Sequence, residues 1–269
     1  MILVIGEALV DVVDGVPHPG GSPTNVAVGL GRLGLDVTLV ATLGDDEHGS
    51  LLRRHVEAAG VTVQATAADR TSSAIASIGP DGAATYEFDI AWDPGRIDVP
   101  PGVTAVHVGS IGAVLEPGAA AVEKLVLDLP SATRVSLDPN VRPALVADRA
   151  EAVARLDRLA ARADVVKVSD EDLAWWHPDT SEDELVERWL AGTTSLVAVT
   201  RGSAGATLVT AEERLDVPPE PVTVVDTVGA GDAFMAGLLG ALERGERTVA
   251  EIGVAAAHSA ALAVGRAGP

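Results

Sequence analysis

The residues best placed to do chemistry stand in VVDTVGAGDAFMAGLL, residues 224–239. The β-branched run at its start predicts a buried strand that ends at the carboxyl edge of a sheet, where open α/β folds bind ligands. Two glycines then allow a sharp turn into a helix and leave the amides of Gly229, Ala230 and Gly231 unobstructed. Unpaired amides at a helix start, together with the helix dipole, form an anion site.

Asp232 follows this turn directly. A carboxylate beside an anion site suits phosphoryl transfer, because the amides stabilise charge on the moving phosphoryl group while the carboxylate accepts the proton of the acceptor hydroxyl. Taken alone, Asp232 would be explained as an ordinary acid in a first helical turn. The two glycines and the alanine before it favour a catalytic base.

Other chemistries are excluded or disfavoured by the remaining motifs. GLGRLG, residues 29–34, satisfies the dinucleotide pattern, but helical residues precede it where a strand is required, so helix packing and a helix stop explain its glycines. Lys124 and Lys167 are the only lysines, and neither lies in the G-K-[ST] context of a P-loop. The chain has no cysteine, and its six histidines show no zinc-binding spacing. A G-x-S-x-G nucleophile elbow is also absent.

The composition indicates an α/β protein that acts on a small molecule. The 269 residues are 47% hydrophobic but only 3% aromatic, which suits helices packed on a sheet through Val, Leu, Ile and Ala. The net charge of −20 argues against nucleic acid or an anionic membrane as a partner. Residues 1–14 lack a basic start and contain Glu7 and Asp11, so they predict a first strand and not a signal peptide. A cytoplasmic protein is expected.

The hydrophobic pattern predicts strands that alternate with helices. ILVIG predicts a strand covered on both faces, a second strand follows in ALVDVVDG, and the first helix is expected from about Asn25 to Leu33. Residues 61–94 change to short segments with a turn at GPDG, which indicates a hairpin. The alternation then resumes and ends with a strand in EPVTVVD and two Ala-rich helices. Such an order implies right-handed crossovers and a mainly parallel sheet.

Two stretches of the chain resemble signatures of the ribokinase-like (PfkB) carbohydrate kinases. DTVGAGDAFMAGLL is similar to the C-terminal signature, and PGGSPTNVAVGLGRLG, residues 19–34, is similar to the N-terminal one. The resemblance implies a Rossmann-like three-layer α/β/α core with a mainly parallel sheet and a small β-sheet lid. It implies one kinase domain over residues 1–269, with the lid from about 9–16 and 61–94. The implied activity is ATP-dependent phosphorylation of a sugar hydroxyl.

The resemblance also implies roles for residues around the sugar. Asp232 would be the base and the amides of residues 229–231 the anion hole, while the sugar hydroxyls would meet Asp11, Gly20, Gly21 and Asn25. A helix cap is the alternative for Asn25. Asn140 and Arg142, from SLDPNVRP, would face the sugar or the transferred phosphate, unless Arg142 caps the next helix. Tyr86 and Phe88 would cover the sugar from the lid hairpin, or only pack the lid.

For the cofactors, the resemblance implies ATP, Mg²⁺ and a monovalent cation such as K⁺. KVSDED takes the place of the family's N-x-x-E motif, so Asp172 would act on magnesium through water, with Ser169 beside it. Lys167 would meet a phosphate, unless it is a surface lysine. His258 would lie beside adenine, unless it is merely a packed helical residue. The remaining implied positions are the nucleotide loop, with Thr200, Gly202 and Gly205, and the monovalent-cation site, with Asp226, Thr227, Ala263 and Gly268.

The choice of substrate depends on SLDPNVRP, KVSDEDLAWW and VHVGSIGA, which are most similar to bacterial fructokinases. Fructose, phosphorylated to fructose 6-phosphate, is therefore the expected substrate. Ribose, 2-keto-3-deoxygluconate and nucleosides are alternatives within the same chemistry. The rivals from other classes are a non-catalytic sugar- or nucleotide-binding protein on the same fold and a nicotinamide oxidoreductase based on GLGRLG. A homodimer is compatible with the family.

Overall fold

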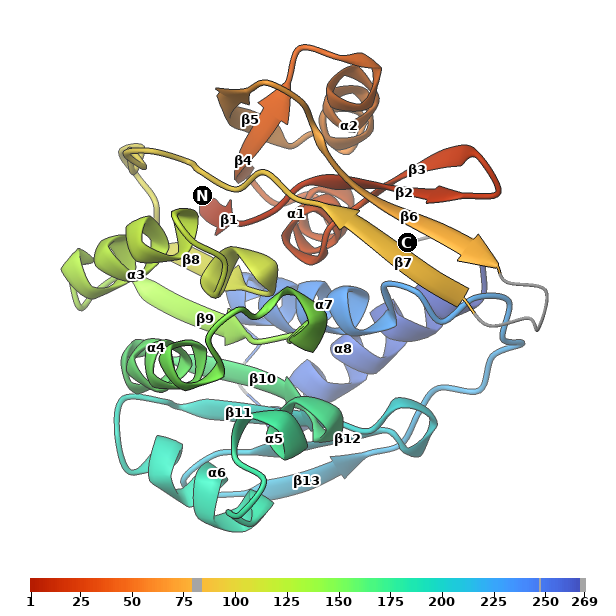
Figure 1. The fold of residues 1–269 in the computed structure, drawn as a ribbon. Coiled ribbons are helices and arrows are strands. Elements are labelled where there is room, and N and C mark those ends of the chain that lie inside the picture. The colour runs from red at the N-terminus through yellow and green to blue at the C-terminus, as the bar shows by residue number, and fades with distance from the viewer. Residues whose placement is uncertain (79–83, 247, 267–269) are drawn as a thin grey trace.

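A large, mainly parallel sheet forms the centre of the molecule (Figure 1). The structure, a computed structural model, describes residues 1–78, 84–246 and 248–266. Within these residues the sheet has nine strands in the order β13-β12-β11-β10-β9-β8-β1-β4-β5. All neighbours pair in parallel except β11 with β12 and β12 with β13. The mainly parallel sheet predicted from the alternation is confirmed.

The central strands are short apolar runs that are buried on both faces. They are β1 (Ile2–Ile5), β4 (Val37–Gly44), β8 (Ala105–Gly109), β9 (Arg134–Asp138), β10 (Val165–Ser169) and β11 (Leu196–Thr200). The last residues of these strands meet at one edge of the sheet, because parallel strands share their direction. Toward one side the sheet continues through β12 (Ala206–Val209) and β13 (Arg214–Val217).

Helices cover both faces of the sheet and make two hydrophobic cores. One layer holds α1 (Ser22–Arg32), α2 (Glu47–Ala58), α7 (Ala230–Arg244) and α8 (Val249–Val264). The other holds α3 (Gly118–Asp128), α4 (Arg149–Arg162), α5 (Asp170–Trp176) and α6 (Glu182–Leu190). Figure 1 shows the two groups on opposite sides of the sheet. This is the three-layer α/β/α architecture that the resemblance implies.

A separate sheet of four strands forms the lid, in the order β3-β2-β6-β7. Its strands are β2 (Leu9–Val13), β3 (Val16–Gly20), β6 (Ser72–Ile78) and β7 (Ala84–Asp89). The boundaries differ from those predicted. β5 (Thr62–Ala68), expected in the lid, pairs with β4 at the edge of the large sheet, and the first lid hairpin extends to Gly20. An alternating pattern marks a half-exposed strand but does not say which sheet it joins.

The expected strand in EPVTVVD is wrong. After β13 the chain runs without regular structure to residue 227, and Val224 is 64% exposed. Pro218, Pro219 and Pro221 have no amide hydrogen to donate to a ladder, which explains why the β-branched run does not extend the sheet. The amide of Val225 donates instead to the Val264 carbonyl at the end of α8, at 2.9 Å. An exposed loop, and not a buried strand, therefore leads into α7.

The glycines of GLGRLG serve helix packing, as the sequence indicates. A Cβ on Gly29 would lie 2.6 Å from the Cβ of Ala236 in α7, and one on Gly31 would lie 2.5 Å from the Ala59 carbonyl oxygen. Gly34 has φ +81°, the left-handed conformation that often ends a helix. The helix itself begins at Ser22 and not at Asn25, because Gly21 is its N-cap and Pro23 is compatible with a first turn.

Among the described residues, none of the helices combines the length and the apolar character needed to cross a lipid bilayer.

Candidate active site

The starts of helices α1 and α7 meet at the carboxyl edge of the large sheet. The loop before α7 ends at Gly229, which has φ +75° and is the N-cap of the helix. Asp232 then lies in the first turn and is buried. Its two carboxylate oxygens are held by α1: Ser22 Oγ donates to Oδ1 at 2.6 Å, and Asn25 Nδ2 donates to Oδ2 at 2.8 Å. The two signature segments, about two hundred residues apart, are thus joined at the predicted base.

Burial raises the pKa of Asp232 above its usual value. The hydrogen bonds from Ser22 and Asn25 oppose that rise, as do the positive charges of Lys167 and Arg142. A carboxylate must lose its proton before it can accept one, so these four groups favour the form that acts as a base. Asn25 is also not the N-cap of α1, since Gly21 holds that position, and the cap alternative is wrong.

The predicted anion hole is the backbone just before Asp232, at the start of α7. Gly229, Ala230 and Gly231 are half-buried. The Ala230 amide donates to the Thr227 carbonyl at 3.3 Å, a long bond that closes the turn. The amides of a first helical turn have no partner within the helix, which is the condition for binding an anion there.

Lys167 supplies a buried positive charge to this turn. Its side chain is 4% exposed, and Nζ donates to Asp138 Oδ2 at 2.9 Å. A Cβ placed on Gly231 would lie only 3.2 Å from the same Nζ, so the glycine allows the ammonium to approach the helix start. The alternative of a surface lysine is therefore wrong. The ammonium and the amides of the turn could therefore donate to the same anionic ligand.

The residues predicted at the sugar, Gly20, Gly21 and Asp11, lie where the lid hairpin leads into α1. Gly20 pairs with Leu9 across the lid hairpin, and any side chain there would collide with the Asp11 carboxylate. Gly21 has φ +98°, and a Cβ on it would lie 2.6 Å from the Glu7 carbonyl oxygen. Burial raises the pKa of Asp11, which His18 and Arg142 oppose. Glycine is thus required at positions 20 and 21 because neighbouring segments of the chain come close there.

Arg142 lies near both predicted acids of the site, since its charge lowers the pKa values of Asp11 and Asp232. Its Nη1 donates to Asn140 Oδ1 at 2.8 Å, and Asn140 has a strained φ of +36°. Arg142 is itself the N-cap residue of the short 3-10 helix Pro143–Leu145, without a side-chain capping bond, so the cap alternative is confirmed for that helix. The N-cap of α4, the following α-helix, is Asp148.

The lid contributes Phe88, which packs against a small cluster of Leu9, Ala74 and Ile111. This cluster joins the lid to the turn that follows β8. Tyr86 is in β7, but its side chain lies outside the described part of the chain. Phe88 is thus placed at the base of the lid, and its contact with a sugar stays a prediction.

Ser169 and Asp172 form a capping box at the start of α5. Ser169 Oγ donates to Asp172 Oδ2 at 2.6 Å, and the Val141 amide donates to Oδ1 at 2.8 Å. Asp172 is buried and lies within the electrostatic reach of Asp138 and Lys167. Both residues therefore lie near Lys167, and their polar atoms are already hydrogen-bonded within the protein.

The predicted nucleotide residues lie along the next strands of the sheet. Thr200 ends β11 and its hydroxyl donates to the Val168 carbonyl at 3.4 Å. Gly202 and Gly205 follow in a tight turn and have φ +51° and +89°, which a residue with a side chain adopts only with strain. His258 is 56% exposed on α8, and its Nδ1 lies 2.9 Å from Glu220 Oε2, so it is not a packed core residue.

Part of the predicted monovalent-cation site comes together at one corner. The amide of Asp226 donates to the Val264 carbonyl at 3.2 Å, next to Ala263, and Thr227 follows directly. Asp226 Oδ1 accepts from the Val228 amide at 2.9 Å. Gly268, the remaining member of this prediction, lies outside the described residues.

Three residues at the site were not predicted: Ser22, Glu7 and Asp138. Ser22 shares one turn of α1 with Asn25, so the spacing alone would have placed both on one side of that turn. Glu7 follows β1, and its Oε2 accepts from the Gly112 amide at 2.8 Å. Burial raises the pKa of Glu7 to about 7, and the negative charge of Asp232 adds to the rise. An acid directly after or at the end of an apolar parallel strand is the signal that marks Glu7 and Asp138.

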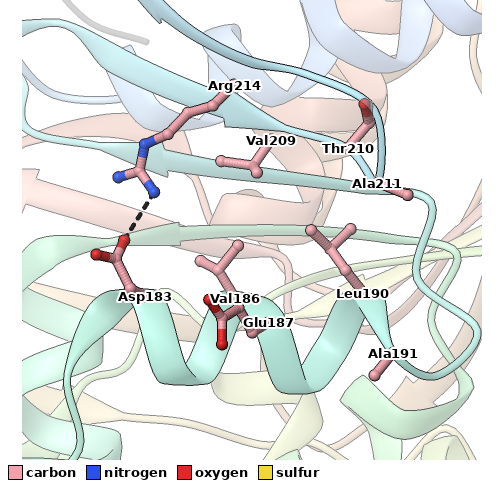
Figure 2. A pocket seen from close by; sticks show the side chains of 9 residues that line it. All are labelled: Asp183, Val186, Glu187, Leu190, Ala191, Val209, Thr210, Ala211 and Arg214. Atoms are coloured by element: carbon pink, nitrogen blue, oxygen red, sulfur yellow. Dashed lines mark hydrogen bonds and ion pairs between the residues drawn. The ribbon is translucent and has the colours of Figure 1, made fainter.

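A different hollow, of about 500 Å³, lies far from these residues (Figure 2). It is formed by α6 and by the ends of β12 and β13 at the border of the large sheet, and Arg214 Nη1 bonds Asp183 Oδ1 across it at 2.7 Å. None of the predicted site residues lines it. The cluster around Asp232 therefore remains the candidate active site.

Comparison with known proteins identifies sugar kinases as relatives of the chain. The chain is 38% identical over 261 residues to a fructokinase from Rhizobium leguminosarum bv. trifolii, covering 90% of this chain and 80% of the relative. It is 36% identical over 259 residues to a fructokinase from Klebsiella pneumoniae, covering 90% and 84%.

Solved structures give the same result. A fructokinase from Vibrio cholerae O395, in a form with fructose, ADP and calcium ion bound, matches with a TM-score of 0.86 and 27% identity over 99% of this chain and 93% of that one. The aminoimidazole riboside kinase from Salmonella enterica, complexed with aminoimidazole riboside and an ATP analogue, has a TM-score of 0.84 and 29% identity over 99% and 94%.

The ribokinase-like resemblance in the two signatures is thus confirmed over the length of the chain, and so is the catalytic class it implies. Because the family model for pfkB family carbohydrate kinases matches residues 3–269, the chain belongs to that family and is a sugar kinase.

Proposed function

We propose that the protein transfers the γ-phosphoryl group of ATP to fructose. The accessible primary hydroxyl of the sugar makes fructose 6-phosphate the expected product. The observation that carries the proposal is the buried Asp232 carboxylate. It accepts hydrogen bonds from α1, and it lies in the first turn of α7, whose start Lys167 approaches. The fructokinases among the relatives support fructose as the substrate.

Asp232 acts as the general base in this proposal. It accepts the proton of the sugar hydroxyl as the oxygen attacks phosphorus, a role that contributes about 10²–10⁴-fold in comparable enzymes. Ser22 and Asn25 orient the carboxylate by bonding one oxygen each. The lone pairs not used by these bonds are left for the hydroxyl.

The transferred phosphoryl group occupies the turn at residues 229–231. Amides at the start of α7 donate to its oxygens, and the Lys167 ammonium adds a fixed positive charge nearby. Arg142, which already acts on the pKa of both Asp11 and Asp232, is placed to contact the sugar or the moving phosphoryl group. The sugar is held by Asp11, Asn25 and the backbone at residues 20–21, with Phe88 covering it.

The nucleotide lies along the ends of β10 and β11, with Thr200, Gly202 and Gly205 near its phosphates and ribose and His258 near the base. Mg²⁺ bound with ATP would neutralise phosphate charge in the transition state. Within the described residues no three His, Cys, Asp or Glu side chains gather in a way that could hold a metal. Such an ion would therefore be held jointly with the phosphates, as Mg²⁺ commonly is. K⁺ at residues 226–227 and 263 stays a prediction, as does a homodimer.

The test is ADP release across a panel of sugars and nucleosides, with the wild type and the Asp232→Asn variant. Fructose should give the highest kcat/KM, and Asp232→Asn should lower kcat by about 10²–10⁴-fold while the affinities for fructose and nucleotide change little. Asp36→Asn makes the same change in an exposed side chain before β4, at the opposite edge of the sheet, and should keep wild-type activity.

Three outcomes would contradict parts of the proposal. An Asp232→Asn variant with most of its activity would show that another group is the base. Fructose that raises the melting temperature without ever yielding ADP would favour the non-catalytic sugar-binding rival. Preference for a nucleoside over fructose would favour the alternative that the similarity to the aminoimidazole riboside kinase supports.

A further inference from the structure

We infer that Asp46 is a positioning residue for the sugar site. It fixes the base of the lid strand β6 through Thr71, and so sets the place of Asp11 in the neighbouring strand β2. The inference rests on the proposed function, in which Asp11 binds the sugar. Asp46 itself belongs to the turn between β4 and α2, which carries none of the residues assigned to the site.

The lid depends on its base for its position. Within the described residues, no backbone ladder joins the four-stranded sheet of the lid to the nine-stranded sheet. The lid is therefore held by the segments that enter and leave it and by the side chains that bind those segments. One such segment is 69–71, which leads from β5 in the large sheet to β6 in the lid.

Asp46 binds the last residue of this segment. Its Oδ2 accepts from the Thr71 amide at 2.7 Å, and its Oδ1 accepts from the Thr71 hydroxyl at 2.7 Å. The hydroxyl oxygen in turn accepts from the Gly44 amide at 2.9 Å. Thr71 is only 4% exposed, so water cannot readily replace these partners. The three bonds join the end of β4 to the start of β6.

A helix cap accounts for only part of this arrangement. Asp46 is the N-cap of α2, and its Oδ1 accepts from the Gly49 amide at 2.7 Å. Capping needs that bond alone, whereas the two bonds to Thr71 reach 25 residues along the chain. The glycines of the turn allow this approach. A Cβ on Gly44 would lie 2.6 Å from the Thr71 amide nitrogen, and one on Gly49 would lie 2.9 Å from Thr71 Oγ1.

The carboxylate is also kept in its charged form. Burial acts in the opposite direction, but the hydrogen bonds from Gly49 and Thr71 hold the pKa of Asp46 below its usual value. A charged acceptor makes stronger hydrogen bonds than a neutral one, so the contact with Thr71 is suited to fixing a position.

The pairing of the lid strands connects Thr71 to Asp11. β6 begins at Ser72, directly after Thr71, and pairs in parallel with β2, where Asp11 is the partner of Ala74. Ala74 lies about 10 Å along the strand from Thr71. A displacement at the start of β6 is passed to β2 through this ladder, since the two strands form one rigid unit. Asp11 would then miss a sugar hydroxyl although no residue that touches the sugar had changed.

Thr71→Val tests the inference, because valine is also β-branched but can neither donate to Asp46 nor accept from Gly44. The KM for fructose should rise about 10–100-fold, while kcat and the KM for ATP stay within about threefold. Thr71→Ser keeps the hydroxyl and should leave the KM for fructose within about threefold of the wild type. Asp46→Asn should raise it as Thr71→Val does, since the amide nitrogen cannot accept a hydrogen bond.

Thr194→Val is the matched control. Thr194 is also buried, and its hydroxyl donates to the Ala163 carbonyl at 3.0 Å, just before β11 in the large sheet. Both valine variants should lower the melting temperature by a few degrees, because each loses a buried hydroxyl. Only Thr71→Val should change the KM for fructose, which a merely structural role would leave unchanged.

Calorimetric titration of fructose without nucleotide gives a second readout that needs no phosphoryl transfer, and the Kd should rise with the KM. The assignment is overturned if Thr71→Val and Asp46→Asn keep the wild-type Kd and KM for fructose, or if Thr71→Ser raises both as much as Thr71→Val. A wild type that binds fructose more tightly than Thr71→Val but never releases ADP would support the positioning role and contradict the proposed function.

Discussion

Two buried acids near the carboxyl ends of parallel strands, Glu7 after β1 and Asp138 in β9, have pKa values raised to about 7 for the same reason. Each carboxyl group is buried, which disfavours its charged form and raises its pKa. The hydrogen bonds that each accepts lower the pKa only in part. Such groups bind a proton in the folded protein at pH values where the unfolded chain has lost it. Stability therefore depends on pH in a direction opposite to that of an ordinary salt-bridged carboxylate.

For Glu7 the window follows from its ordinary pKa of 4.5 and the raised pKa of about 7. Its contribution is fully present below pH 4.5 and is lost as the pH rises through 7, by at most about 3 kcal/mol at about 1.4 kcal/mol per pH unit. Glu7→Gln cannot titrate. Denaturant unfolding at pH 5, 6, 7 and 8 should therefore show the variant gaining stability relative to the wild type as the pH rises.

A difference between Glu7→Gln and the wild type that is the same at all four pH values would contradict this prediction. The same measurement on Asp36→Asn, which removes an exposed carboxylate, supplies the control.

The sequence identified part of the site at this scale, for a definite reason. Asp232 and Asn25 stand in motifs whose glycines allow a close approach of the backbone, and Lys167 stands at the end of a predicted strand. The structure brings all three together. Glu7 and Asp138 stand alone among apolar residues. Their places near strand ends are a local signal, but their burial depends on strands and loops far away in the sequence.

At the scale of elements, the site depends on how closely α1 and α7 approach each other. Gly29 faces Ala236, and a Cβ on Gly29 would lie 2.6 Å from the Ala236 Cβ, well inside the normal contact of two methyl groups. The same two helices hold Ser22, Asn25 and Asp232. A change in their spacing should therefore affect stability and catalysis together.

Gly29→Ala should lower the free energy of unfolding by about 1–3 kcal/mol through overpacking, and should reduce kcat because the hydrogen bonds to Asp232 lengthen. Urea unfolding and the ADP-release assay measure the two effects. The double variant Gly29→Ala with Ala236→Gly moves the methyl group to the other helix and should restore most of both. Failure of the double variant to recover would mean that the helix contact is not the cause.

The elements themselves were predictable where a pattern was long and uniform. The buried parallel strands and the amphipathic helices are of this kind, and they occur as expected. Short strands were missed: β3 contains two prolines, and β13 contains charged residues, so neither resembles a strand by composition. EPVTVVD shows the reverse error. Its β-branched residues favour a strand, but the prolines before and within it cannot donate hydrogen bonds to a neighbouring strand.

At the scale of the whole molecule, the net charge of −20 is the dominant property of the surface. Like charges repel one another more in the compact protein than in the unfolded chain, and the repulsion extends over roughly 30 Å at 0.01 M salt but about 8 Å at 0.15 M. Raising NaCl between these concentrations should raise the melting temperature by about 2–4 °C, as expected for about 1 kcal/mol in a chain of this size.

Choline chloride and KCl at the same concentrations separate screening from specific binding. All three salts screen alike, so an additional rise in KCl alone would indicate the monovalent-cation site at residues 226–227. A melting temperature that does not change in any of the salts would contradict the role of charge repulsion.

The hydrogen bonds from Ser22 and Asn25 to Asp232 join positions 210 and 207 apart in the sequence. During synthesis on the ribosome the N-terminal strands and α1 emerge long before α7 exists, so most of the parallel sheet can form around an incomplete centre. Until α7 leaves the exit tunnel, the nascent chain lacks Asp232, the residue that we propose as the base. Kinase activity in a cell-free system should therefore appear only after translation has passed α7, which makes it a readout of the joining of α1 and α7.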